Sequence, residues 1–167
     1  HLYSITGNIH IPEKLVEMMD TNPFVASNNS SFTADADNSR YVVENGALYD
    51  MAATHKWLIA YPNAAEAEEV IVKEGIIRIG GSAFYRNPNI KEVILPDSML
   101  QIGNSAFSES AIETIEIPSS VKYIYGSAFA NASSLKTVYL KSTSFTQFTS
   151  NNTFIGLAPN SIIYTES

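Results

Sequence analysis

Three histidines are the side chains of this sequence best suited to acid-base or metal chemistry, because imidazole changes its protonation near neutral pH and ligates metals. They are His1, His10 and His55, and they lie far apart along the chain. None has a nucleophile, a carboxylate pair or further metal ligands at a spacing typical of a catalytic or metal site. His10 takes an outward position of a predicted strand and His55 a predicted hairpin turn, so we expect these histidines to be solvated or to serve in packing.

Carboxylates and glycines give no stronger chemical signal. Asp35, Asp37 and Asn38 resemble the start of a calcium-binding loop, but glycine and glutamate are missing from the sixth and twelfth positions that an EF-hand requires. The glycine pair at 80–81 lacks the flanking pattern of a phosphate-binding loop, and the acidic run at 66–69 is typical of a solvated surface. The sequence therefore predicts a protein that is not an enzyme and that needs no metal or other cofactor.

Composition restricts the classes of partner. The chain has 167 residues, of which 45% are hydrophobic, and this is enough for one domain with a continuous core. Its formal net charge of −7 repels a phosphate backbone or an anionic membrane, so we expect no nucleic-acid partner. No apolar run reaches the roughly 18 residues that cross a bilayer, so we expect no membrane insertion. The sequence contains no cysteine, which excludes disulfides and cysteine-based zinc sites.

A short repeat organises the chain. The tripeptide Ser-Ala-Phe occurs three times, and its phenylalanines Phe84, Phe107 and Phe129 are 23 and 22 residues apart. A short apolar run starts 14 residues before each of them, and a second pair of apolar residues lies between the run and the tripeptide. Each repeat thus reads as strand, turn, apolar pair, Ala-Phe and loop, with its clearest copies over residues 67–140.

Stacking is what this repeat requires, because a three-residue strand cannot bury itself alone but can pair with the same strand of the next repeat. We predict a right-handed, β-rich (α/β) solenoid that spans residues 1–167 as one domain. Side chains alternate along a strand, and the phenylalanines are expected to form an aromatic spine opposite the strands. The predicted inward positions are Val70, Val72, Val93, Leu95, Ile115, Ile117, Val138 and Leu140.

Weaker repeats flank the clear ones. The run 138–140 leads to Phe154 with two extra residues, and 162–164 reads as a last strand. At the other end, 9–11 and 32–34 read as strands of the same ladder, which gives about seven strands in total. Residues of about 38–62 interrupt the period, and the Asn-Gly pair at 45–46 between apolar runs predicts an inserted β-hairpin or small meander at the edge of the solenoid.

The repeat resembles that of the BspA-like leucine-rich repeats of bacterial surface proteins. The segment AIETIEIPSSVKYIYGSAF carries the resemblance, and the insert NSRYVVENGALYDMAATHKWLIAYP looks like the hairpin that such proteins place between repeats. Tyr125 replaces one glycine of the family pattern, and Asn87, Ser110 and Ala132 stand near its cysteine position. The resemblance implies a secreted or cell-surface bacterial protein, from which a signal peptide has been removed, whose repeats mediate adhesion or other protein contacts.

The outward strand positions are the candidate binding site, because stacking collects them on the sheet surface that solenoids use for binding. Several are aliphatic or aromatic, and an exposed apolar patch often marks an interface. We expect this face to bind a protein or glycan ligand, including one of host origin, and the last strand to allow oligomerisation. The candidate row comprises Ile71, Ile94, Glu116, Tyr139 and Ile163, with His10 and Thr33 beyond the insert, and the polar border comprises Glu69, Glu92, Thr114 and Thr137.

Two other functions remain open at this point. The repeats could act as a structural spacer that holds another domain away from the cell, in which case the apolar row reflects only the β-propensity of branched residues. A glycan-active hydrolase would need two carboxyl groups at glycosidase separation in one cleft. The sequence alone does not place any pair of carboxylates in this way.

Overall fold

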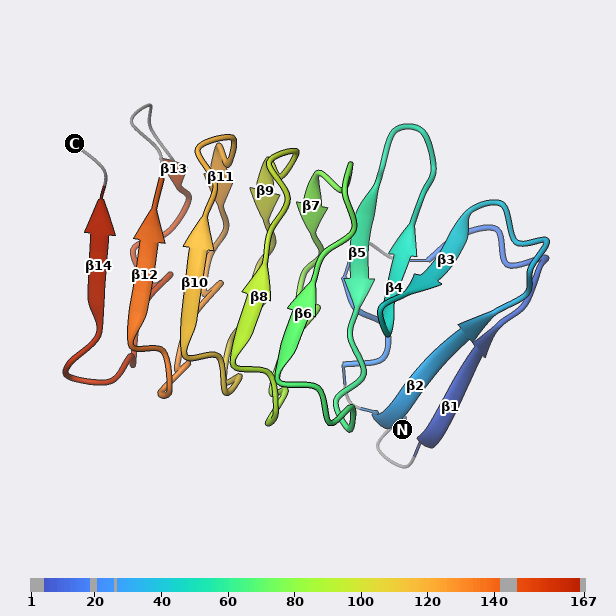
Figure 1. The fold of residues 1–167 in the computed structure, drawn as a ribbon, viewed down its shortest axis with the longest axis horizontal. Coiled ribbons are helices and arrows are strands. Elements are labelled where there is room, and N and C mark those ends of the chain that lie inside the picture. The colour runs from blue at the N-terminus through green and yellow to red at the C-terminus, as the bar shows by residue number, and fades with distance from the viewer. Residues whose placement is uncertain (1–4, 19–20, 26, 142–146, 166–167) are drawn as a thin grey trace.

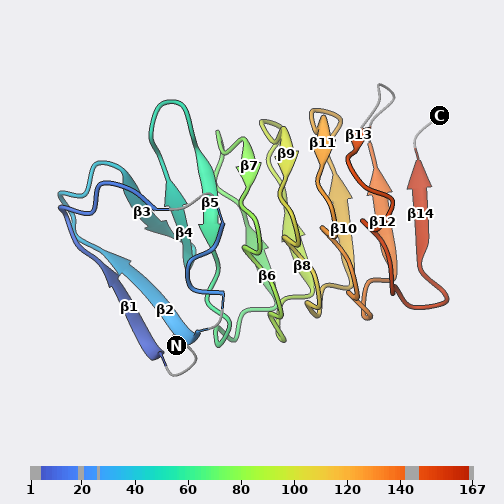
Figure 2. The ribbon, with the colours of Figure 1, turned by 180° about the vertical axis from the view of Figure 1, so that it is seen from behind.

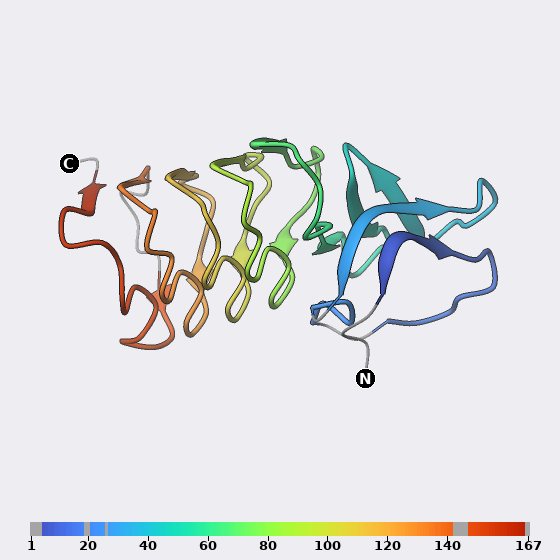
Figure 3. The same cartoon turned by 90° about the horizontal axis from the view of Figure 1, so that it is seen from below.

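The computed structural model describes residues 5–18, 21–25, 27–141 and 147–165, and these form strands and turns without any helix. Fourteen strands are arranged in three sheets, and the repeats lie side by side along the long axis of the molecule (Figures 1 and 3). The predicted solenoid of short parallel strands is confirmed. No part of the described chain supplies the helical component that an α/β class would include.

Two parallel sheets form two sides of the solenoid. The first sheet contains β6 (Glu69–Ile71), β8 (Glu92–Ile94), β10 (Thr114–Ile117), β12 (Thr137–Leu140) and β14 (Ile162–Thr165). The second sheet includes β7 (Arg78–Ile79), β9 (Gln101–Ile102), β11 (Tyr123–Ile124) and β13 (Gln147–Phe148), and it faces the viewer in Figure 2. Each repeat contributes one strand to each sheet, so the apolar pair of the repeat is also part of a strand ladder.

The Ser-Ala-Phe turns form the third side. The serines Ser82, Ser105 and Ser127 adopt φ angles of 57°, 53° and 57°, in the left-handed region. This turn directs the next phenylalanine inward, and the backbone N–H of Phe107 donates to the carbonyl of Ala128 in the following repeat at 2.7 Å. Backbone hydrogen bonds therefore join consecutive repeats on all three sides, which satisfies the polar groups that such short strands would otherwise leave unpaired.

The core is a continuous column. The residues predicted to point inward are buried, apart from the half-buried Leu140. Phe84, Phe107 and Phe129 are fully buried and stack with ring centroids 5.0 and 5.2 Å apart, which confirms the aromatic spine. Tyr61 extends the spine at one end and Phe154 at the other, at 5.6 and 5.3 Å. Stacked rings contribute beyond the area they bury.

The predicted insert is a three-stranded antiparallel meander of β3 (Tyr41–Glu44), β4 (Ala47–Asp50) and β5 (Trp57–Ala60). Asn45 and Gly46 join its first two strands with φ angles of 50° and 79°, as a tight hairpin requires. The hairpin prediction is confirmed, but the meander is also joined to the solenoid by strand pairing. Strand β5 pairs in parallel with β7, so the meander continues the second sheet.

The N-terminal strands do not continue the first sheet, contrary to prediction. Strands β1 (Thr6–Ile11) and β2 (Asn28–Ala34) pair in parallel with each other and form a separate two-stranded sheet at one end of the molecule (Figure 1). His10 and Thr33 are neighbours there, and they do not join the row of Ile71 and Ile94. The reason is that the chain enters the meander after β2, and the meander extends the second sheet, so the first sheet begins at β6.

Candidate binding faces

Pairing register places the predicted binding residues in two rows on the outer face of the first sheet. Ile71 pairs with Ile94, and Glu116 pairs with Tyr139. The second row follows from the pairs Glu69 with Glu92, Glu92 with Thr114, and Thr114 with Thr137. The structure therefore assembles eight of the nine candidate residues of this sheet into the two predicted rows.

The ninth residue, Ile163, is one position out of register. It pairs with Val138 of the inward row, whereas Tyr139 pairs with Tyr164. The two tyrosine rings stack with centroids 5.1 Å apart, so Tyr164 replaces Ile163 as the last member of the outward row. A shift of one residue exchanges the faces of a strand. Paired residues are 25 apart between β12 and β14, as in Thr137 with Ile162, whereas they are 22 or 23 apart in the preceding repeats.

The outward row of the first sheet exposes several large apolar side chains to solvent. Ile71, Ile94, Tyr139 and Tyr164 are 52%, 42%, 43% and 48% exposed. A shallow depression of about 200 Å³ lies between β8 and β10 on this face, lined by Glu92, Val93, Ile94, Leu95, Asp97, Glu116 and Pro118. Its lining combines aliphatic carbons with three carboxylates. Such a surface suits a group of a partner molecule that combines an apolar part with a positive charge.

Carboxylates border this apolar row. Glu69 and Glu92 are direct neighbours in the parallel pairing of β6 with β8, and neither forms an ion pair with any described residue. Like charges at adjacent positions of a sheet destabilise it, so this pair favours a cationic group placed between them. Glu116 differs, because Lys141 lies 3.4 Å from its carboxylate.

A second ladder of charges runs just before these strands. Lys91 forms an ion pair with Glu68, and Lys136 forms one with Glu113, so acidic and basic side chains alternate over four repeats. The ion pair with Lys136, and more weakly the charge of Lys91, lower the pKa of Glu113. Exposed ion pairs add little stability each. Their alternation instead favours one order and register of the repeats.

The meander contains a cluster of ionisable groups that sequence reasoning missed. The carboxylate of Asp50 is almost fully buried, lies 2.8 Å from Nη2 of Arg40 and 3.4 Å from Nδ1 of His55, and accepts the backbone N–H of Ala52 at 2.9 Å. Burial acts to raise the pKa of Asp50, but the bonds from Arg40 and Ala52 outweigh it and lower that pKa. Every acceptor of this carboxylate is engaged in holding the β4–β5 connection, so the cluster is structural.

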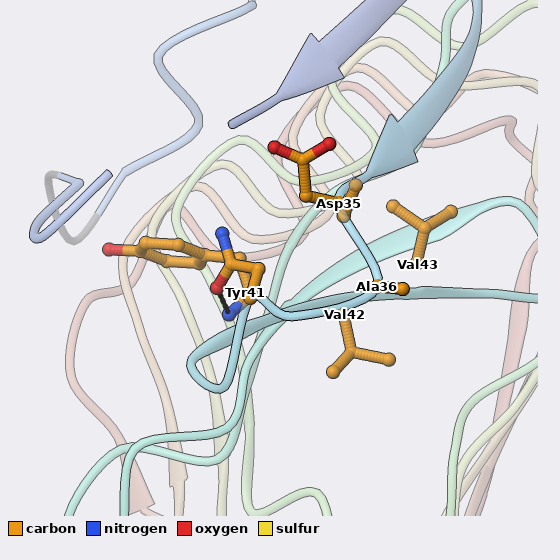
Figure 4. A pocket seen from close by; sticks show the side chains of 7 residues that line it. Asp35, Ala36, Tyr41, Val42 and Val43 are labelled. Atoms are coloured by element: carbon orange, nitrogen blue, oxygen red, sulfur yellow. Dashed lines mark hydrogen bonds between the residues drawn. The ribbon is translucent and has the colours of Figure 1, made fainter. Parts of the chain in front are cut away.

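Of the three residues that resemble the start of a calcium-binding loop, Asp35 and Asn38 form hydrogen bonds within the protein. Asp35 accepts hydrogen bonds from the backbone N–H of Glu13 at 2.8 Å and lies 3.1 Å from Nε2 of His10. The nearby depression of about 210 Å³, between the end of β2 and β3, has a mixed lining of polar and apolar side chains, namely Ala34, Asp35, Ala36, Asn38, Tyr41, Val42 and Val43 (Figure 4). Throughout the described residues, no three His, Asp or Glu side chains are grouped so that they could hold a metal ion.

Comparisons with solved structures agree with this architecture. A leucine-rich repeat protein from Eubacterium ventriosum is 25% identical with a TM-score of 0.73, over 81% of this chain and 36% of that one. The pneumococcal vaccine antigen PcpA is 18% identical with a TM-score of 0.73, over 98% and 46% of the two chains. A leucine-rich cell surface protein from Faecalibacterium prausnitzii is 24% identical with a TM-score of 0.62, over 96% and 48%. This chain thus spans less than half the length of each of these proteins.

Sequence comparison gives the family. No significantly similar protein was found among curated sequences. In the described segments, no helix is long and apolar enough to cross a membrane. Residues 59–167 match six copies of the BspA type leucine rich repeat region, and this range covers both sheets from β5 onwards. The chain therefore belongs to the family of BspA-type leucine-rich repeat proteins.

Proposed function

We propose that this domain is a non-enzymatic protein-binding module of a secreted or cell-surface protein, and that it binds through the outer face of the first sheet. One observation carries the proposal: four large apolar side chains, Ile71, Ile94, Tyr139 and Tyr164, stay exposed in a single row of a rigid sheet. Partner binding would bury this row, and exposed apolar patches of this kind commonly mark interfaces. The surface description of one structural neighbour supports the location.

The chemistry of the face also defines its partner. Aliphatic and tyrosine side chains suit the core of a protein interface, and Tyr is enriched among residues that dominate binding energy. The unpaired carboxylates of Glu69 and Glu92 at the border favour a partner with lysine or arginine beside its apolar anchor. We therefore expect a protein ligand with a basic rim, of host or bacterial origin, to bind here through adhesive contacts.

The test is a double variant of the face, Ile94→Lys with Tyr139→Glu, compared with the wild type against an array of host matrix proteins, mucins and glycans. Both side chains are about half exposed, so the variant is expected to fold. Loss of a specific signal, with unchanged circular dichroism and thermal midpoint, would support the proposal.

A matched control uses Val16→Glu with Ile155→Lys, which makes the same charge changes at two exposed apolar residues outside the first sheet. The control variant should retain binding. A specific ligand that binds the face variant as well as the wild type would contradict the proposed site. If no ligand binds at all, a structural spacer becomes the better description of the domain.

A further inference from the structure

The outer face of the second sheet has a chemistry different from that of the first. Pairing register aligns one residue from each of five consecutive strands, β5, β7, β9, β11 and β13, in a single row. The row combines two aromatic rings, one guanidinium and two amides. Its members are Trp57, Arg78, Gln101, Tyr123 and Gln147.

Arg78 is the central residue of this row. Its guanidinium carbon lies 4.4 Å from the ring centre of Trp57 and 5.7 Å from that of Tyr125. Tyr125 lies two repeats further along the column, two residues after Tyr123 of the row. The two rings therefore hold the guanidinium in a fixed place on the sheet.

The charge of Arg78 is not neutralised within the described protein. Its Nε is buried and has no hydrogen-bond partner, and its guanidinium forms no ion pair with any described carboxylate. The other two arginines differ, because Arg40 pairs with Asp50 and Arg86 pairs with Glu109. An aromatic cage does not replace a hydrogen-bond acceptor, so a buried donor is left unsatisfied at a cost.

Two other unpaired cations are next to members of this row in the sequence. Lys56 directly precedes Trp57 and Lys122 directly precedes Tyr123, and neither forms an ion pair among the described residues. This local excess of positive charge occurs in a chain whose net charge is −7. The molecule thus has an acidic, apolar first sheet and a basic, aromatic second sheet, and an anion is the complementary ligand for the second.

We propose that this face binds a saccharide that carries a carboxylate, as in a sialic or uronic acid. The terminal Nη groups of Arg78 would form a charge-assisted hydrogen-bond pair with the carboxylate, because Nε is buried and a guanidinium presents two parallel Nη donors. The amide of Gln101, the next residue in the row, would bond ring hydroxyls, and the exposed ring of Tyr123 would pack against the sugar face.

An acidic peptide is the less favourable ligand for this face. Peptides commonly bind to sheets by adding a strand at an exposed edge. The strands β7, β9 and β11 are internal, with a paired strand on each side, so their backbone groups are already used. A peptide could therefore contact only side chains on this face and would form no backbone hydrogen bonds with the sheet. A sugar ring can bind through side-chain contacts alone.

Intrinsic fluorescence tests the proposal directly, because Trp57 is the single tryptophan of the chain and contacts Arg78. The probes are sialyllactose and trigalacturonate, each compared with its carboxyl methyl ester, together with lactose and an acidic hexapeptide. We expect the free acids to change the emission saturably and to bind about tenfold or more tightly than their esters, as charge-assisted bonds predict. This comparison uses only the wild-type protein.

Variants locate the binding on the molecule. Arg78→Met keeps the aliphatic stem between the rings and should lose about tenfold or more in affinity for the acids. Arg86→Met is the matched control, because Arg86 also lies over a tyrosine ring, at 5.0 Å, but is already paired with Glu109. The control should bind as the wild type does.

Three results would overturn the proposal. They are no fluorescence change with either acid up to about 10 mM, equal binding of acids and esters, and binding of the acidic hexapeptide that is as tight as that of the sugars. Preference for sialyllactose or for trigalacturonate would identify the class of acid. The first sheet is not involved in any of these measurements, so their outcome is independent of the protein-binding function.

Discussion

Replacing the central phenylalanine of the spine measures how strongly the repeats depend on one another. Phe107 is fully buried, and its ring stacks on Phe84 at 5.0 Å and on Phe129 at 5.2 Å. Phe107→Ala should lower the free energy of unfolding by about 3–5 kcal/mol, the usual cost of removing a buried aromatic ring. Two stacked neighbours place this site at the upper end of that range, because each stacked pair contributes about 0.5–1.5 kcal/mol beyond burial.

Two further variants separate stacking from volume. Phe107→Leu keeps most of the buried volume and removes both stacks, so we expect a loss of about 1–3 kcal/mol. Phe154→Ala is the matched control at the end of the spine, where the ring is only half-buried and stacks on one side, at 5.3 Å from Phe129. It should cost about 1–2 kcal/mol less than Phe107→Ala.

Equilibrium unfolding in urea provides the measurement, followed both by far-ultraviolet circular dichroism and by Trp57 fluorescence. Coincident transitions would show that repeats far from Trp57 unfold together with it. The reasoning would be refuted if Phe107→Ala cost less than about 2 kcal/mol, or no more than Phe154→Ala. Either result would mean that the stacked rings fill space without joining the repeats.

Three other perturbations have definite expected outcomes. Gly103→Ala should destabilise the fold strongly, because a Cβ there would lie 2.7 Å from the backbone nitrogen of Gly81. Gly126→Ala should be tolerated better, because the atoms nearest to its Cβ would lie at 3.4 Å. The thermal midpoints of the two variants test this difference. Asp50→Asn should cost roughly 2 kcal/mol at neutral pH by leaving Arg40 without its buried partner. The pKa of Asp50 in the folded protein lies below its unfolded value of about 3.9. Its contribution to the free energy of unfolding is therefore present above about pH 4 and disappears as the pH falls through the folded pKa. Acid unfolding tests the sign, because the stabilities of the wild type and the variant should converge at low pH. Burial raises the pKa of Tyr49 to about 12, so ultraviolet titration should find a tyrosine that ionises after the exposed ones; its ionisation near pH 10 would contradict that environment.

Residue spacing predicted the central repeats well because their physical requirement is strict. Each phenylalanine must meet the next one in the column, and the spacings of 23 and 22 residues keep Phe84, Phe107 and Phe129 in one stack. Alternation along each strand was enough to predict which side chains of the first sheet point inward and which point outward. Alternation could not reveal β7, β9 and β11 as strands, since two residues are too few to show a period.

Longer connections caused the errors. The segment between β12 and β14 carries extra residues, so counting placed Ile163 where Tyr164 lies. At the N-terminal end, the spacing between β1 and β2 resembled the repeat, but the chain then leaves the first sheet for the meander. Spacing along a chain does not record which sheet a strand will join when an antiparallel insert follows it.

The basic face was missed for a different reason. Trp57, Arg78 and Tyr125 lie far apart in the sequence, and only the stacking of the strands brings their side chains together. A scan for local motifs does not detect such a triplet. The second apolar pair of each repeat ends at Ile79, Ile102 or Ile124. Aligning the repeats on these isoleucines, and then comparing the residue directly before each one, would have brought Arg78, Gln101 and Tyr123 together.

The alternating charges before the first sheet have a consequence for how such a protein can change length. Loss of the single repeat that carries Lys91 would bring Glu68 next to Glu113, two carboxylates where an ion pair now stands. Loss of two consecutive repeats would instead leave Glu68 beside Lys136, and opposite charges would meet again. For these four charges, the addition or removal of repeats in pairs therefore keeps opposite charges adjacent, whereas the removal of one repeat does not.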